Sequence, residues 1–243
     1  VTCNNPDCLI VDAEEKRTTT EMQSRSTFLS QNWDFASIWG RPLAGGYMVH
    51  QWQGITLDVS SPFAGGDGSG GTPYQIATAD QLNSIGSNTT LITKSYILNS
   101  DIDLAGITFN EIGGSAGFSG TFNGNSKIIS NLTINKPTKS QQGLFGYVNN
   151  GTISSLGLTG VNISGFDYTG GMVGYLYKGS IANSYSTGTV TGNRFHTGGL
   201  VGHLGENADS DTLNVGTISS SYSTATVTAL GSYSGGLVGK TMQ

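Results

Sequence analysis

Short apolar runs, interrupted by glycine and asparagine, follow one another from Lys94 to the end of the chain. In one of them, Leu132 and Ile134 alternate with polar residues at 131, 133 and 135. An alternation with a period of two is typical of a strand that buries one face. The pattern therefore predicts a succession of short strands from Lys94 onward, with no helix among them.

A glycine-rich motif recurs four times in the second half of the chain. Its copies are QGLFG, GGMVG, GGLVG and GGLVG, at residues 142–146, 170–174, 198–202 and 235–239. The glycine before each apolar pair (Gly143, Gly171, Gly199, Gly236) advances by 28, 28 and 37 residues, and the last step contains nine additional residues, 206–214. A fixed period of this size is typical of a solenoid, in which each repeat packs only against its neighbours.

The predicted fold is an all-β solenoid, a right-handed parallel β-helix with one coil per 28 residues. The handedness follows from the strong preference of parallel crossover connections. We expect the insertion 206–214 to loop out of its coil. We also expect like residues to stack in columns: Ile153, Ile181 and Ile218; Leu144, Met172, Leu200 and Leu237; Phe145, Val173, Val201 and Val238.

One short helix is predicted before the β-rich region, near 78–86. Thr78 and Gln81 have the spacing of a capping box, and Leu82 and Ile85 share one face of a helix that ends at Gly86. Such a helix can cover the open first coil, whose unpaired strand edge would otherwise recruit other strands.

Composition divides the chain into three parts. Glycine, proline and serine are frequent in 60–73, which is predicted to link an N-terminal segment, 1–59, to a β-helix, 74–243. Residues 1–59 contain all three tryptophans, and 18–28 is predicted to form a short helix. Because a segment this short has little core of its own, Trp33, Phe35 and Trp39 need another surface to cover.

Charge excludes one class of partner. Charged residues make up 11% of the 243 residues and the formal net charge is −5, without the clustered lysine and arginine that nucleic-acid binding requires. No apolar run approaches the ~18 residues of a membrane span. The chain begins without methionine or a signal-peptide pattern, so we expect a processed subunit or a piece of a longer protein.

Residues 170–192, GGMVGYLYKGSIANSYSTGTVTG, resemble the GLUG repeat of large, mostly bacterial, secreted surface proteins. Residues 73–146 resemble the segment that usually precedes those repeats, so the resemblance covers about 73–239. It implies an extracellular or cell-surface β-helix of adhesins and related proteins, and it implies no catalytic residues and no cofactor. The N-terminal segment resembles the tail that usually follows the last repeat, so the order is rotated in this chain.

Cys3 and Cys8, the only cysteines, flank Pro6 at a spacing that favours a small local disulfide loop and hence an oxidising compartment. Two free thiols are the alternative. Four Asn-x-Ser/Thr sequons are compatible with glycosylation: Asn88, Asn131, Asn150 and Asn162.

The chain is predicted not to be an enzyme. Its three histidines, the only bases near neutral pH, are His50, His196 and His203, and the last two are predicted to be exposed polar residues. Between 143 and 205 the only charged residues are Asp167, Lys178 and Arg194. That supply is too small for the acidic calcium site of a polysaccharide lyase.

Two acidic clusters are candidates for a metal site. The insertion places Glu206, Asp209 and Asp211 close together, and such oxygen ligands can hold Ca²⁺. A solvated acidic loop is the favoured interpretation. Asp101 and Asp103 lie in a strand pattern and are predicted to face solvent.

Two columns of side chains are candidates for binding. Tyr185 and Tyr222 share one position of the repeat, and aromatic rings on a β-helix face can stack on sugars; alternatively, they stack on one another. Residues 187–191 and 224–228 place threonines at alternating positions, which suits ice binding, but threonine is also a common outward-facing strand residue.

The predicted function is that of a non-enzymatic, extracellular structural or adhesive repeat protein, with a glycan-binding module as the alternative. Its expected partners are other copies of itself, flanking units of a longer protein, or surface glycans. We expect a head-to-tail filament in which residues 1–59 of one subunit, with Trp33, Phe35 and Trp39, cover the open C-terminal coil of the next.

Overall fold

The computed structural model describes residues 39–40, 49–50, 62–86, 88–205 and 216–241. The chain divides into two compact units, Val1–Ser61 and Pro62–Gln243. In the first unit, β1 (Trp39–Gly40) pairs antiparallel with β2 (Val49–His50). The second unit contains helix α3 and strands β3 to β18.

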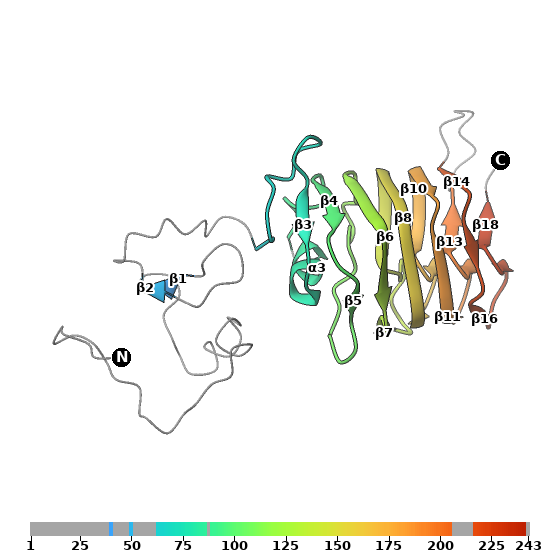
Figure 1. The fold of residues 1–243 in the computed structure, drawn as a ribbon. Coiled ribbons are helices and arrows are strands. Elements are labelled where there is room, and N and C mark those ends of the chain that lie inside the picture. Colours follow the sequence, from blue (N-terminus) through green and yellow to red (C-terminus); the bar gives the residue numbers. More distant parts are fainter. Residues whose placement is uncertain (1–38, 41–48, 51–61, 87, 206–215, 242–243) are drawn as a thin grey trace, which may run out of the picture. The chain divides into compact units, whose positions relative to one another are not determined.

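Short strands separated by tight corners make up the second unit (Figure 1). In chain order, the strands and the one named helix of this unit are β3 (Tyr74–Ile76), α3 (Ala79–Gly86), β4 (Ser95–Leu98), β5 (Ile102–Asp103), β6 (Thr121–Ser130), β7 (Thr133–Asn135), β8 (Phe145–Gly165), β9 (Thr169–Gly170), β10 (Val173–Ala182), β11 (Tyr185–Gly192), β12 (Thr197–Gly198), β13 (Val201–Leu204), β14 (Thr217–Ser219), β15 (Tyr222–Ser223), β16 (Thr226–Ala229), β17 (Ser234–Gly235) and β18 (Val238–Thr241).

The strands stack coil upon coil, and every pairing between named strands of this unit is parallel. The main order is β18-β13-β10-β8-β6-β4-β3, seen side by side in Figure 1, and a smaller sheet has the order β17-β12-β9. Val173 pairs with Val201, 28 residues on, and Ile181 pairs with Ile218 across the insertion. The fold is a parallel β-helix, as predicted. The predicted 28-residue offset holds from β8 to β10 and from β10 to β13, whereas the offset is 26 residues from β4 to β6 (Ser95–Thr121) and 31 from β6 to β8 (Thr121–Thr152).

Columns of like residues fill the interior. Leu144, Met172 and Leu200 have no exposed surface, and neither have Phe145, Val173 and Val201. The N–H of Met172 donates to the Leu200 carbonyl and that of Leu200 to the Leu237 carbonyl, both at 2.9 Å. The third predicted column is in register too, since Ile181 pairs with Ile153 and with Ile218, so all three columns are confirmed. Burial of apolar surface contributes about 25 cal/mol per Å² to stability. Because these side chains bury their surface against the coils on either side, each coil is stabilised chiefly by its two neighbours.

Helix α3 closes the N-terminal end of the β-helix. The N–H of Gln81 donates to Thr78 Oγ1 (3.3 Å), and Gln81 Oε1 accepts from the N–H groups of Thr78 (3.2 Å) and Ala77 (2.7 Å). These are the reciprocal bonds of the predicted capping box. Leu82 and Ile85 are buried in the core, so the helix covers the first coil.

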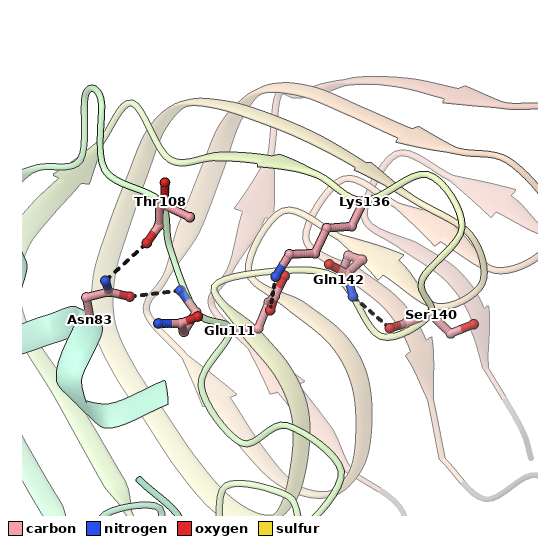
Figure 2. A network of polar contacts seen from close by, with 7 residues as sticks. Asn83, Thr108, Glu111, Lys136, Ser140 and Gln142 are labelled. Carbon is pink, nitrogen blue, oxygen red and sulfur yellow. Dashed lines mark hydrogen bonds and ion pairs between the residues drawn. The ribbon is translucent and has the colours of Figure 1, made fainter. Parts of the chain in front are cut away.

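Hydrogen bonds join α3 to the coil that follows it (Figure 2). Asn83 Nδ2 donates to the carbonyl of Thr108 (3.1 Å), and its Oδ1 accepts from the N–H of Asn110 (2.8 Å). Next to them, Lys136 Nζ lies 2.7 Å from Glu111 Oε2. The capped end is therefore held by both apolar and polar contacts.

The described part of the segment rich in glycine, proline and serine, 62–73, packs on the first coil. Phe63 is buried, and its ring stacks on Tyr74 with centroids 4.4 Å apart. The N–H of Ala64 donates to the Gln75 carbonyl, and that of Gln75 donates to the Gly65 carbonyl. A glycine-rich sequence suits a tight loop as well as a linker, and here one aromatic residue holds that loop on the first coil.

Candidate functional site: the last coil

The last described coil, residues 216–241, leaves apolar side chains uncovered. Within the described residues, the large hydrophobic side chains that are exposed are Tyr222 (54%), Leu230 (75%) and Tyr233 (54%), all in this coil. Ile218, Val227, Leu237 and Val238 are half-buried, whereas their partners one coil earlier, Ile181, Val190, Leu200 and Val201, have no exposed surface.

The strands of this coil also have an unpaired edge. Within the described part of the chain, β14, β15, β16, β17 and β18 each pair with a preceding strand only: β10, β11, β11, β12 and β13 respectively. Unpaired N–H and C=O groups at such an edge are a template for a further strand. The edge and the uncovered side chains together form one surface, which we call the open end.

The tyrosine column ends at the open end. Tyr185 and Tyr222 stack with centroids 5.2 Å apart and an interplanar angle of 8°. The ring of Tyr185 covers Gly157, where a Cβ would lie 2.6 Å from its hydroxyl oxygen. The alternative in which the two rings stack on one another is therefore confirmed, and only Tyr222, in the last coil, retains a largely open ring.

A second aromatic cluster lies where the smaller sheet meets the main one. Tyr168, His196 and Tyr233 occupy one position in successive coils, all with φ between 56° and 66°. The His196 ring stacks on Tyr168 (4.9 Å, 2°) and on Tyr233 (5.2 Å, 10°). Left-handed backbone is unusual for such bulky residues, and the stacked rings offset its cost.

A neighbouring column completes the cluster. The strand register aligns Tyr147, Tyr175, His203 and Lys240. The ring of His203 lies 5.1 Å from Tyr175 and 4.9 Å from His196. Lys240 Nζ lies 4.8 Å from the centre of the Tyr233 ring. We call Tyr168, Tyr175, His196, His203, Tyr233 and Lys240 the aromatic corner.

The prediction that His196 and His203 are exposed polar residues is wrong. His196 is 9% exposed and His203 is fully buried. Neither ring nitrogen of His196 has a hydrogen-bond partner within the described residues. Burial lowers the pKa of His196, with a smaller lowering from Lys240 and an opposing effect of Asp167. This setting favours the neutral imidazole, because charging it would place a cation away from water and near Lys240.

The carboxylates in the described part of the repeats bond to neighbouring polar side chains. Asp101 and Asp103 are exposed, as predicted, and Asp103 Oδ1 accepts from Asn131 Nδ2 (2.8 Å), which lowers the pKa of Asp103. Asp167 Oδ2 lies 3.1 Å from Arg194 Nη1. Within residues 62–86, 88–205 and 216–241, no three His, Cys, Asp or Glu side chains lie close enough together to hold a metal ion.

The threonine positions form a short ladder. Thr189 pairs with Thr226 and Thr191 with Thr228. The preceding coil has Asn162 and Ser164 at the two positions, so the ladder has only two threonine rungs there.

Several predicted site residues lie outside the described residues. They are Cys3, Cys8, Trp33 and Phe35 in the first unit and Glu206, Asp209 and Asp211 in the insertion. For Trp39 and His50, the backbone belongs to β1 and β2, and the side chains are not described.

Comparison with known proteins supports the repeat interpretation. Residues 168–191 match the GLUG motif, which confirms the resemblance to GLUG-repeat proteins. The chain is 30% identical over 112 residues to "Halomucin" of Haloquadratum walsbyi, covering 41% of this chain and 1% of that protein. It is 36% identical over 109 residues to a "Putative Gly-rich membrane protein" of Evansella cellulosilytica, covering 42% of this chain and 12% of that protein.

Among solved structures, the chain is similar to a "putative immunoglobulin A1 protease" from Bacteroides ovatus. The identity is 19% and the TM-score 0.36, over 71% of this chain and 76% of that one. A likeness at this level carries no argument about function. The GLUG motif and the two relatives support the interpretation of the chain as a repeat protein. No helix among the described residues is long and apolar enough to span a bilayer.

Proposed function

We propose that the chain is an extracellular structural and adhesive module without enzymatic activity, which associates head to tail through its open end. The single observation that carries this proposal is the coincidence, in one coil, of the exposed large hydrophobic side chains and the unpaired strand edge. A non-enzymatic role is supported by the described ionisable groups of the repeats, since both histidines are buried and Asp167 is paired with Arg194.

The two ends of the β-helix differ in their free strand edges, and we infer the partner from this difference. The outer edge of β3 is already occupied, since Gln75 exchanges backbone hydrogen bonds with Ala64 (2.9 Å) and Gly65 (2.8 Å). The first strand of a second copy therefore has no free edge to stack on the open end. Residues 1–59 of a second copy are the occupant we propose, since they contain Trp33, Trp39 and Trp52 and belong to a separate unit, Val1–Ser61. A contact of this kind is heterologous, so it propagates as a filament unless it closes into a ring.

Gly236 gives a specific test of docking at the open end. A Cβ on Gly171 would overlap the Gly199 carbonyl of the next coil, and a Cβ on Gly199 would overlap that of Gly236. At Gly236 a Cβ meets nothing within 4 Å. An added methyl group at this position therefore leaves the isolated unit intact and obstructs a strand docked in the same register.

The experiment compares the intact chain, Gly236→Ala and a chain lacking residues 1–59 by sedimentation velocity over a concentration series. We expect the intact chain to associate, Gly236→Ala to associate roughly tenfold more weakly, and the deletion to remain monomeric. If Gly236→Ala blocks association and the deletion does not, the open end is the interface but its occupant is another coil.

Glycan binding is the second candidate function, supported by the exposed ring of Tyr222. A glycan array tests it with Tyr222→Ala and Leu230→Ala as a matched pair of exposed truncations in the same coil. Binding that is lost only in Tyr222→Ala would favour this candidate over axial association.

A further inference from the structure

In both columns of the aromatic corner, histidine replaces tyrosine in the same coil. One column contains Tyr168 and Tyr233 on either side of His196, and the other contains Tyr147 and Tyr175 before His203. The two imidazoles therefore touch, at 4.9 Å between ring centres. Tyrosine occupies both positions in the preceding coil, as Tyr168 and Tyr175, so ring stacking alone does not require histidine at 196 and 203.

His196 has an environment that responds to protons. Its ring is 9% exposed between two tyrosine rings, and neither nitrogen has a partner within the described residues. The titratable and charged groups that face it are Tyr168, Tyr233, His203, Lys240 and Asp167, with Arg194 paired to Asp167. A proton on His196 therefore adds a buried positive charge whose solvation requires a ring to move.

The ring that can move is Tyr233. It is 54% exposed, and the strands that follow it, β17 and β18, are bonded on one side only within the described residues. Tyr168, on the opposite face of His196, precedes β9, which is covered by the next coil.

We propose that the aromatic corner is an acid-sensitive latch, in which a proton on His196 releases Tyr233 and loosens β17 and β18 from β12 and β13. Well above pH 6.5 the imidazole is uncharged in both the closed and the open coil, and the latch is fully closed. Its contribution falls as the pH drops below about 6.5, the ordinary histidine pKa, and is lost below the lowered pKa of the closed state. If the proposed function is correct, acid also releases a partner docked on the open end.

Hydrogen exchange in the full chain tests the latch without reference to assembly. Protection of residues 232–241 is compared at about pH 7.5 and about pH 5, corrected for intrinsic exchange, at concentrations where sedimentation shows monomers. Residues 121–135, in a coil without histidine, are the internal control. We expect the wild-type chain to lose protection several-fold at the lower pH in 232–241 and not in 121–135.

Two variants identify the group responsible. His196→Tyr and His203→Tyr each introduce the ring that earlier coils carry at the same position. We expect His196→Tyr to retain protection at both pH values and His203→Tyr to keep the wild-type pH dependence. Equal wild-type protection at the two pH values overturns the proposal, and so does a pH effect removed by His203→Tyr but not by His196→Tyr. Failed assembly with an intact pH effect counts against the proposed function only.

Discussion

Gly202 of β13 lies directly against the backbone of Thr169, so that a Cβ on Gly202 would stand 2.5 Å from the Thr169 nitrogen. The carbonyl oxygen of Gly174 and the carbonyl carbon of Tyr168 are almost as close, at 2.6 and 2.7 Å. The last glycine of the GGLVG copy at 198–202 thus marks the place where the smaller sheet packs backbone to backbone on the main sheet. Because the atoms it meets belong to the backbone, no side-chain rotation can make room.

Gly202→Ala is therefore expected to destabilise the β-helix by about 1–3 kcal/mol or more, the usual range for overpacking. Gly236→Ala is its matched control, since a Cβ there meets nothing within 4 Å. Urea unfolding followed by circular dichroism compares the two, and equal free energies of unfolding would contradict the backbone contact.

A charge in the central column tests burial. Val201→Asp places a carboxylate between Val173 and Val238, where the wild-type residue has no exposed surface, and is expected to cost at least about 3 kcal/mol. Val238→Asp, in the half-buried last coil, should cost distinctly less. Urea unfolding compares the free energies of unfolding of the two variants. A larger loss for Val238→Asp than for Val201→Asp would mean that the last coil is covered in the isolated chain.

The capping box predicts a local effect at the N-terminal end. Thr78→Ala removes the acceptor of the Gln81 N–H and should lower the free energy of unfolding by about 1 kcal/mol. Thr138→Ala, at an exposed turn position, is the control and should be close to neutral. A neutral Thr78→Ala would show that tertiary contacts alone hold α3.

The tyrosine column predicts unequal effects of two equal truncations. Tyr185→Ala uncovers Gly157 and removes the partner of Tyr222, so it should cost about 2 kcal/mol. Tyr222→Ala removes one stack at an exposed position and should cost about 1 kcal/mol or less. Thermal unfolding of the two variants at low concentration checks this order.

The repeat predicts most of the fold because identical contacts recur between coils. The spacing from Gly171 to Gly199 is also the offset of the Val173–Val201 pair, so period and register carry the same information. Stacking of Leu144, Met172 and Leu200 follows from that offset together with the apolar pattern.

The aromatic corner could not be predicted from the sequence in the same way. The sequence of a strand does not indicate whether a second layer covers its polar residues. The layer over His203 depends on the close approach of two backbones at Gly202. Comparison of the copies gives a partial signal. The residue four positions after each reference glycine is Tyr147, Tyr175, His203 or Lys240, a column that the motif alone does not reveal.

Sedimentation velocity of the intact chain and of Gly236→Ala tests association at the open end. We expect concentration-dependent association of the intact chain, weakened roughly tenfold in Gly236→Ala at unchanged monomer stability. An intact chain that stays monomeric at high concentration, or a Gly236→Ala chain that associates as strongly as the intact one, would contradict it.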